Sequence, residues 1–422
     1  MKLIEEFNWR GIVYQASEGL DAMLETEQVT GYIGFDPSAS SLHVGSLLPV
    51  MSLARFQRHG HRPIAVVGGG TGMVGDPSGK SEERPLMTLA QIEENLAGLR
   101  AQLTPFLDFN AKKNAALMVN NADWLATIPL MEFLRDTGKY FTVNYMLGKE
   151  SVRRRIDSEE GISFTEFSYM LLQAYDYLML HDRHACKLQM GGSDQWGNIT
   201  AGMDLIGRLH RVQAHGLVFP LVTSATGRKF GKTEAGTVWL DAKLTSPYRF
   251  YQFWYNTDDR DVITYLKFFT WLEPREIGEL ENDVRTSPGQ RAAQIRLARE
   301  VTRMVHGESA VAGAERASKA LFGEEISALS PDELLDVFQE APSSRVDKSK
   351  LDGAGLPVID VMLLAGLAAS KGEARRLVEG GGVYLNNRRV DAKQFVTSRD
   401  ALHGRFLVLR RGQKEFRLVE LA

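Results

Sequence analysis

The chain has 422 residues, 44% of them hydrophobic, so it can bury a large core and is longer than one ordinary domain. The formal net charge of −3 by itself favours no class of partner, but the charge is uneven along the chain. Residues 356–422 contain 12 Lys and Arg against 7 Asp and Glu, a net charge of +5, which leaves −8 for the residues before them. We therefore predict two or three domains, of which the last is basic.

Cysteine content and the pattern of apolar residues indicate the cellular compartment in which the protein is expected. The single cysteine, Cys186, leads us to exclude an intrachain disulfide and any zinc cluster, which indicates a reducing compartment. The N-terminal stretch lacks the apolar core of a signal peptide, and no apolar run is as long as a membrane span. We expect a cytoplasmic protein that does not contact a membrane.

The first informative stretch predicts a strand, a loop and a helix start. Residues 31–35 form an apolar run of strand length, Asp36 and the following proline are typical of a turn, and apolar residues recur at helical spacing over 42–56. Ser40 or Ser41 can cap this helix. Its first-turn amide groups, at the positive end of the helix dipole, would then bind phosphate.

Two residues in the first turn of that helix strengthen the phosphate interpretation. His43 can point its imidazole at the same anion, and Gly45 lets a flat base lie against the backbone. Together they suggest a nucleotide triphosphate. The alternative is an ordinary buried strand and amphipathic helix with one surface histidine, because short motifs have a high false-positive risk.

A second predicted strand, 63–67, leads into a glycine-rich stretch with two misleading motifs. The glycines of 70–75 match the dinucleotide fingerprint, but the next helix starts only at the capping box of 88–91. Residues 79–81 resemble the end of a P-loop, but Val74 occupies the place of its first glycine. Neither motif is supported by its context.

Further along, strands alternate with helices. Residues 117–120 read as a strand, and 130–137, 143–155 and 164–180 read as helices. Such alternation is typical of an α/β fold with a mostly parallel sheet.

The last of these helices carries polar residues on one face. Ser163 begins a capping box, and Tyr169, Gln173 and Asp176 follow at i, i+4 and i+7. A solvated polar face is one interpretation. If the face is buried instead, it should bind something, because buried polar groups need partners.

Two later loops follow strands. The predicted strand 187–190 ends in the Gly-Gly-Ser-Asp-Gln-Trp loop of 191–198, and the ligands of open α/β sheets bind beyond strand C-termini. Beyond the strand 217–223, two lysines, a glycine and a hydroxyl in 227–233 could close over phosphates. Each stretch alone is also consistent with a plain surface loop.

The C-terminal third changes character. Residues 247–322 show no strand signal and read as helices, whereas 339–355 are rich in linker residues. The basic module then contains helices from 358 and 370 and short strands near 382–385 and 406–409. A compact basic fold of this size suggests RNA as its partner, with a charged solvated face as the alternative.

Taken together, these motifs resemble bacterial-type tyrosyl-tRNA synthetase, a class I aminoacyl-tRNA synthetase, over nearly the whole chain. Several motifs in the family's order are far more specific than any one of them. The matching segments are 32–37, 42–46 in place of the family's His-Ile-Gly-His, 75–80, 168–176, 191–198, and 229–233, which is similar to the Lys-Met-Ser-Lys-Ser loop.

The resemblance implies a domain order that agrees with the composition. It implies an α/β, Rossmann-like parallel-sheet catalytic domain over 1–246, an α-helical anticodon-side domain over 247–338, a linker over 339–355 and a small α+β RNA-binding domain of the ribosomal-protein type over 356–422. It also implies a homodimer in which one tRNA(Tyr) spans both subunits, and no DNA partner.

The implied reaction has two steps. The carboxylate of L-tyrosine attacks the α-phosphate of ATP to give tyrosyl-adenylate and pyrophosphate, and a terminal ribose hydroxyl of tRNA then takes the tyrosyl group. No protein nucleophile, tightly bound cofactor or protein metal site is implied, and Mg²⁺ accompanies the ATP. By resemblance, the catalytic residues are His43, Ser38, Lys80, Arg84, Lys229, Lys232 and Thr233, and the ATP-binding residues are Asp36, His43, Gly45, Ser46, Asp194, Lys229 and Lys232.

The tyrosine site is implied in the same way. Asp176 would accept the phenol proton and Tyr32 would donate to the same oxygen. Phenylalanine would leave both unpaired, so no editing domain is expected, an argument for which tyrosyl-tRNA synthetase is itself the standard example. The remaining residues expected around tyrosine are Tyr169, Asp76 and Gln173 for the ammonium group, with Asn121 and Gln195 nearby.

One residue departs from the family pattern, and two alternatives stay open. Ser46 replaces the usual second histidine, so its ATP contact is uncharged. Tryptophanyl-tRNA synthetase shares the fold, although Asp176 with Tyr32 favours a phenol over an indole. A catalytically idle paralogue retained for RNA binding is the second alternative, against which the intact motifs weigh.

Overall fold

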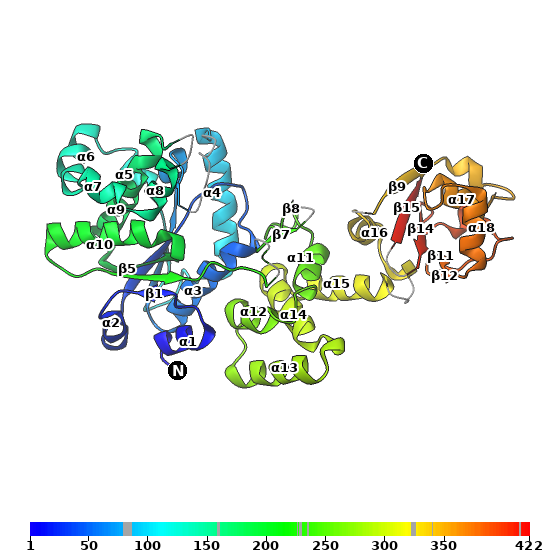
Figure 1. Cartoon of the computed structure of the whole chain (residues 1–422), viewed down its shortest axis with the longest axis horizontal. Coiled ribbons are helices and arrows are strands. Elements are labelled where there is room, and N and C mark those ends of the chain that lie inside the picture. The colour runs from blue at the N-terminus through cyan, green and yellow to red at the C-terminus, as the bar shows by residue number, and fades with distance from the viewer. Residues whose placement is uncertain are drawn as a thin grey trace. The chain divides into compact units, whose positions relative to one another are not determined.

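The chain forms two compact units, Met1–Leu244 with Thr257–Leu297, and Thr245–Asn256 with Ala298–Ala422. Each unit has its own core and is described by itself (Figure 1). The computed structural model describes residues 1–78, 87–157, 161–225, 227, 230–233, 236–321, 326–339, 341–412 and 415–422.

The first unit is built on a six-stranded sheet with the strand order β1-β6-β5-β2-β3-β4. Strands β2 to β6 pair in parallel, and the short β1 is antiparallel to β6. The predicted α/β class with a mostly parallel sheet is therefore confirmed. The strands are β1 (Gln15–Ala16), β2 (Thr30–Phe35), β3 (Arg62–Val67), β4 (Leu117–Asn120), β5 (Cys186–Gly192) and β6 (His215–Phe219), with a separate hairpin of β7 (Lys232–Thr233) and β8 (Gly236–Thr237).

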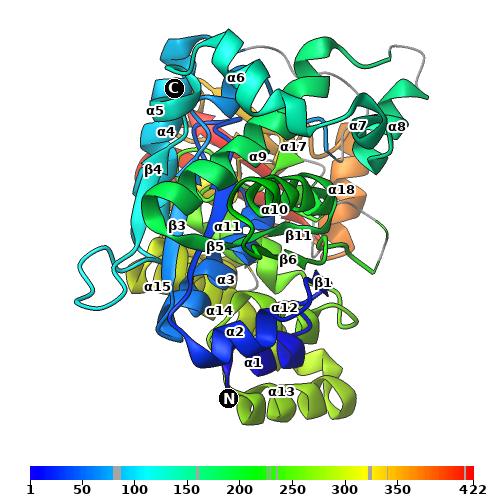
Figure 2. The ribbon, with the colours of Figure 1, turned by 90° about the vertical axis from the view of Figure 1, so that its left-hand side faces the viewer.

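Helices cover both faces of this sheet, as right-handed crossovers require (Figure 2). The long helices α9 and α10 lie side by side on one face. Their buried side chains share a core cluster with Tyr32, Ile64 and Val66 of the sheet. The helices are α1 (Leu3–Arg10), α2 (Leu20–Thr26), α3 (Leu47–Arg58), α4 (Leu89–Leu103), α5 (Ala122–Leu125), α6 (Leu130–Asp136), α7 (Val143–Leu147), α8 (Glu150–Ile156), α9 (Phe164–His184), α10 (Trp196–His210), α12 (Val262–Phe269), α13 (Pro274–Thr286) and the start of α14 (Ala292–His306).

One predicted helix is in fact two. The stretch 143–155 contains α7 and α8, separated at Gly148 and Lys149, because Gly148 ends α7 and Lys149 has the extended backbone of a helix N-cap. Apolar periodicity does not detect such a break, since both pieces bury residues in the same core.

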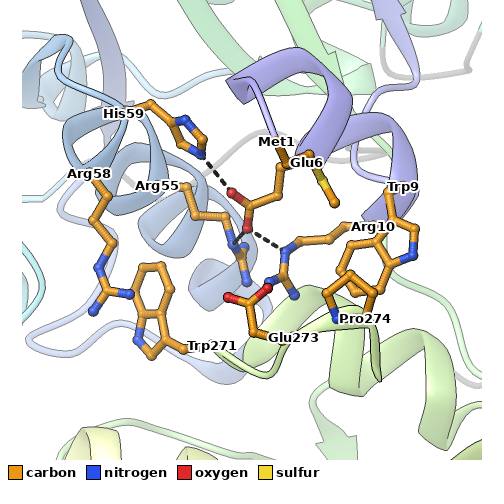
Figure 3. Close-up of a pocket in the computed structure, with 10 residues that line it drawn as sticks. All are labelled: Met1, Glu6, Trp9, Arg10, Arg55, Arg58, His59, Trp271, Glu273 and Pro274. Atoms are coloured by element: carbon orange, nitrogen blue, oxygen red, sulfur yellow. Dashed lines mark hydrogen bonds and ion pairs between the residues drawn. The ribbon is translucent and has the colours of Figure 1, made fainter. Parts of the chain in front are cut away.

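A cluster of charged side chains joins α12 to the sheet domain (Figure 3). Glu6 on α1 accepts hydrogen bonds from Arg10 Nε and His59 Nε2, both at 2.7 Å, and Arg55 Nε lies 3.6 Å away. The buried guanidinium groups of Arg10 and Arg55 also satisfy carbonyl oxygens at the C-terminal end of α12, where cations are favoured. These oxygens belong to Lys267, Phe268, Thr270 and Leu272.

The second unit carries a five-stranded sheet of order β12-β11-β14-β15-β9. One face packs against α17 and α18, and the other packs against α15 and α16. Its elements are α11 (Pro247–Tyr255), α15 (Glu308–Leu321), α16 (Pro331–Val337), β9 (Ser343–Val346), β10 (Leu356–Pro357), α17 (Val358–Leu364), α18 (Lys371–Glu379), β11 (Val383–Leu385), β12 (Arg388–Arg389), β13 (Phe395–Val396), β14 (Phe406–Arg411) and β15 (Glu415–Leu421).

The two units divide the chain differently from the predicted domains. Residues 257–297 belong to the unit of the large sheet, and α15 and α16 share a core with the small sheet. The stretch predicted as a linker, 339–355, contains β9, which pairs in parallel with β15. The domain boundaries of 246, 338 and 355 stay predictions. Within the described residues, no helix is long and apolar enough to span a membrane.

Candidate functional site

The polar face of α9 is buried beneath the C-terminal ends of the strands. Ser163 caps the helix by accepting a hydrogen bond from the Glu166 amide at 3.2 Å. Tyr169 and Asp176 are each only 4% exposed, so the predicted row of polar residues is not a solvated surface. The Tyr169 hydroxyl donates to Asp36 Oδ2 at 3.1 Å, which ties α9 to the turn after β2.

Asp176 is a buried carboxylate held by neutral donors. Asn121 Nδ2 donates to one oxygen at 2.9 Å, and Trp124 Nε1 donates to the other at 2.6 Å. Burial raises the pKa of Asp176 to about 7, although these two hydrogen bonds oppose the rise. The carboxyl group is therefore poised to change protonation near neutral pH.

Tyr32 presents a buried hydroxyl to the same space. Its ring is 2% exposed and packs edge-on against Tyr177, with the ring centroids 5.3 Å apart. The hydroxyl has no hydrogen-bond partner within the described part of the chain. Burial, and then the nearby charge of Asp176, raises the pKa of Tyr32 well above its usual value, so the group stays a donor. A buried donor without a partner is costly and suggests a ligand contact.

A second hydrogen-bonded group lies beside the first. Gln195 Nε2 donates to Asp76 Oδ2 at 2.6 Å, and Gln173 Nε2 donates to Gln195 Oε1 at 3.2 Å. Asn198 Nδ2 donates to Gln173 Oε1 at 3.1 Å. Three residues expected near the tyrosine ammonium group are thus linked, and Asn198, which the site prediction omitted, joins them.

The helix start near His43 differs from the prediction. Neither Ser40 nor Ser41 caps the helix: a 3₁₀ turn over Val44–Ser46 precedes α3, and His43 Nδ1 accepts from the Gly45 amide at 3.0 Å. The Ser41 side chain is not available as a helix cap, because its hydroxyl donates to the Leu42 carbonyl and accepts from the Gln102 side chain. The exposed His43 therefore stands at the helix start itself.

The lysine-bearing hairpin lies against this helix start. The Val44 amide donates to the Val238 carbonyl at 3.0 Å, and the Val238 amide donates to the Gly231 carbonyl at 2.9 Å. Gly231 has φ +78°, and a Cβ there would lie 2.8 Å from a Val44 methyl, so glycine is required. The hairpin that carries the exposed Lys232 of β7 is thereby tied to the turn that begins after His43.

The other predicted site residues are placed as follows. Ser38 is exposed and Ser46 is half-buried ahead of α3, while Asp194 follows β5 next to Gly192. Lys80, Arg84 and Lys229, with the side chain of Thr233, lie outside the described residues.

Besides Asn198, the sequence prediction missed two residues that complete the site. Trp124 donates to Asp176, and Thr71 Oγ1 donates to Asp36 Oδ1 at 3.0 Å while accepting from Asn121 Nδ2 at 2.9 Å. Both follow the C-terminal ends of parallel strands, β4 and β3. Their shared position after strand C-termini could have marked them as candidate site residues.

This arrangement fits what comparison with known proteins shows. A family model described as tRNA synthetases class I (W and Y) matches residues 24–323, and one for the tyrosine–tRNA ligase SYY-like C-terminal domain matches 333–419. A tyrosine–tRNA ligase of Roseiflexus castenholzii is 57% identical over 99% of both chains, and one of Geobacillus stearothermophilus is 50% identical over 100% of both.

Comparison with solved structures gives the same kind of protein. A C-terminally truncated mitochondrial tyrosyl-tRNA synthetase of Aspergillus nidulans has a TM-score of 0.69 and 30% identity, covering 76% of this chain and 94% of its own. The chain therefore belongs to the class I tRNA synthetases of the tryptophan and tyrosine group. Within this group it matches tyrosine–tRNA ligases over its full length, whereas a tryptophanyl-tRNA synthetase of Plasmodium falciparum shares only the fold, at 12% identity.

Proposed function

We propose that the chain is a tyrosine–tRNA ligase that activates L-tyrosine with ATP and transfers the tyrosyl group to the 3′ end of tRNA(Tyr). The observation that carries the proposal is that Asp176 and Tyr32 are buried close to each other without being bonded to each other. A buried carboxylate acceptor and a buried hydroxyl donor without a partner are together complementary to one phenol group. Phenylalanine would leave both unpaired, and an indole offers a donor but no acceptor.

The ammonium group of tyrosine needs acceptors. Asp76 and the amide oxygen of Gln173 supply them, with Tyr169, Asn121 and Gln195 positioning the carboxylates and amides around it. The supporting observations are two hydrogen-bonded groups: Gln195 holds Asp76 in one, and Tyr169 holds Asp36 in the other. Side chains fixed by several hydrogen bonds keep the amino acid in place for attack on ATP.

ATP is bound at the helix start beside the hairpin. His43, Ser38 and Lys232 contact the phosphates, joined by Lys229, Thr233, Lys80 and Arg84. Gly45, Ser46, Asp194 and Asp36 hold the adenosine. The residues that contact the phosphates stabilise the negative charge that grows on the leaving pyrophosphate. ATP enters as its Mg²⁺ complex, the usual form in phosphoryl-group chemistry, and no protein ligand is assigned to the ion.

The active form is a homodimer. Helices α6, α7 and α9 bury residues in one core cluster yet expose large apolar side chains. Exposed apolar groups on neighbouring elements are typical of a protein interface. A Met131→Asp variant should shift the sedimenting species toward the monomer, and an unchanged dimer would contradict this location. The exposed side chains are Leu130, Met131, Leu134, Val143 and Phe164.

The test of the function is ATP–pyrophosphate exchange with tyrosine, tryptophan and phenylalanine in turn, on the wild type and on Asp176→Ala. Exchange driven by tyrosine and lost in the variant is the expected result. Exchange driven by tryptophan would place the chain in the other branch of its family. No exchange with any amino acid, together with tRNA binding, would leave an RNA-binding protein without ligase activity.

A further inference from the structure

Two histidines and one aspartate gather at the C-terminal ends of α9 and α10. His181 and Asp182 belong to the last turn of α9, and His210 is the last residue of α10. Each side chain offers one ligand atom, and these atoms lie within 4.8 Å of one another. His210 Nε2 lies 2.8 Å from Asp182 Oδ1, and the two imidazole ring centroids are 5.3 Å apart.

The hydrogen bonding of His181 prepares it as a ligand. Its Nδ1 lies 3.1 Å from the carbonyl oxygen of Cys186, which can only accept. Nδ1 therefore carries the proton, and the lone pair of the neutral ring is on Nε2. A ligating histidine that donates its other N–H to a carbonyl is the usual arrangement in metal sites.

The C-terminal ends of the two helices add a negative electrostatic field, which favours a cation at this place. Because β5 joins α9 to α10 in a parallel crossover, both helices end at this place, and each end carries partial negative charge. Of three neighbouring arginines, Arg211 is exposed at the C-cap of α10, whereas Arg183 lies over the Trp124 ring at 5.4 Å and Arg208 bonds the Tyr140 carbonyl. The guanidinium groups of Arg183 and Arg208 are thus engaged elsewhere.

We propose that His181, Asp182 and His210 bind a divalent transition metal ion, of which Zn²⁺ fits best. Two imidazoles and one carboxylate are a frequent three-residue Zn²⁺ set, and the fourth position goes to water. Asp182 and His210 are exposed, so small changes of rotamer bring their ligand atoms to bonding distance. Mg²⁺ does not compete, since it prefers oxygen ligands.

This site is separate from the proposed catalytic one. His181 precedes β5, whereas Asp194 and Gln195 follow its other end, and a seven-residue strand spans roughly 20 Å. On α9, Asp176 of the tyrosine site lies one to two turns before His181, roughly 7.5 Å along the helix axis. The bound ion cross-links two helices that pack in the same core. Its role is therefore to stabilise the helix pair that carries the polar face of α9.

The test is calorimetric titration of the full chain with Zn²⁺, with Co²⁺ absorption as a second readout. Wild type should bind one ion at this site. Asp182→Asn and His210→Ala should each weaken that binding by about tenfold or more. The matched control is His184→Ala, because His184 lies on the same last turn of α9 but outside the cluster.

Circular dichroism of each variant separates loss of binding from loss of fold. The proposal is overturned if the Asp182→Asn and His210→Ala variants bind Zn²⁺ as tightly as wild type, or if His184→Ala weakens binding as much as they do. Absence of tetrahedral Co²⁺ absorption in the wild type would equally overturn it.

Discussion

Two shielded carboxylates of the first unit, Asp176 and Glu6, have opposite electrostatics. Asp176 is held by the neutral donors Asn121 and Trp124, and burial raises its pKa to about 7. Burial acts in the same direction on Glu6, but hydrogen bonds from His59 and Arg10, with the charges of Arg10 and Arg55, lower its pKa to about 2 (Figure 3).

The difference separates a binding group from a structural one. The charge of Glu6 is already neutralised by cations that also hold the end of α12, so it has little left to offer a ligand. Asp176 lacks such a partner among the described residues and gains most from a new donor. Five predictions test this contrast.

The largest effect is expected for Asp176→Asn. Replacing the acceptor with an amide removes a charge-assisted hydrogen bond worth about 3 kcal/mol, so kcat/KM for tyrosine in pyrophosphate exchange should fall roughly 100-fold. Some stability should also be lost, because the new amide NH2 group faces either Asn121 Nδ2 or Trp124 Nε1, and that buried donor then lacks an acceptor oxygen. Asp123→Asn, on the exposed side of α5, is the control. A fall of less than threefold would remove Asp176 from the site.

Glu6→Gln should act on stability instead. The change leaves Arg10 and Arg55, both buried, without their counter-charge, and we expect a loss of about 2 kcal/mol in the free energy of unfolding. Urea denaturation measures it, with the exposed Glu18→Gln as control. The tyrosine KM of the folded variant should match wild type, and a raised KM would argue against a purely structural Glu6.

The third prediction concerns pH. Because Asp176 must be ionised to accept the phenol proton, kcat/KM for tyrosine should fall as pH drops through about 7, by roughly tenfold per unit. Exchange rates between pH 5.5 and 8 measure this. In Asp176→Asn the dependence should vanish, whereas persistence there would assign it to another group.

Stability should respond to pH in opposite senses at the two carboxylates. Asp176 has a raised folded pKa, so its contribution is full below its unfolded value of 3.8 and is lost as pH rises through about 7. Glu6 has a lowered pKa in the folded state. Its contribution to stability is therefore present above pH 4.5 and is lost as pH falls through about 2. The free energy of unfolding of wild type is compared with that of Asp176→Asn and of Glu6→Gln across pH 2 to 8. The two differences should change with pH in opposite directions.

Tyr32→Phe should give the smallest effect. The hydroxyl is a neutral donor, so its loss should lower kcat/KM for tyrosine about fivefold. Since the group has no partner among the described residues, removing it should leave the unfolding free energy unchanged or slightly higher. A marked loss of stability would show that the hydroxyl is bonded within the fold.

The sequence predicted the local parts of the site well. Helical spacing placed Tyr169, Gln173 and Asp176 on one face, and strand-and-turn chemistry located β2 and Asp36. Such features depend on residues close in the chain, where periodicity and capping act directly. The family motifs then supplied the class of reaction, which local chemistry alone left open.

Tertiary structure decided what these residues contact. That Asn121 and Trp124 hold Asp176, that Ser41 turns to Gln102 instead of capping a helix, and that α12 joins the large sheet all depend on segments far apart in sequence. The pKa of a carboxyl group is set by its partners and its burial, and neither is encoded at its own position. The sequence determined which polar groups exist on each element, and packing determined which of them stayed available to a substrate.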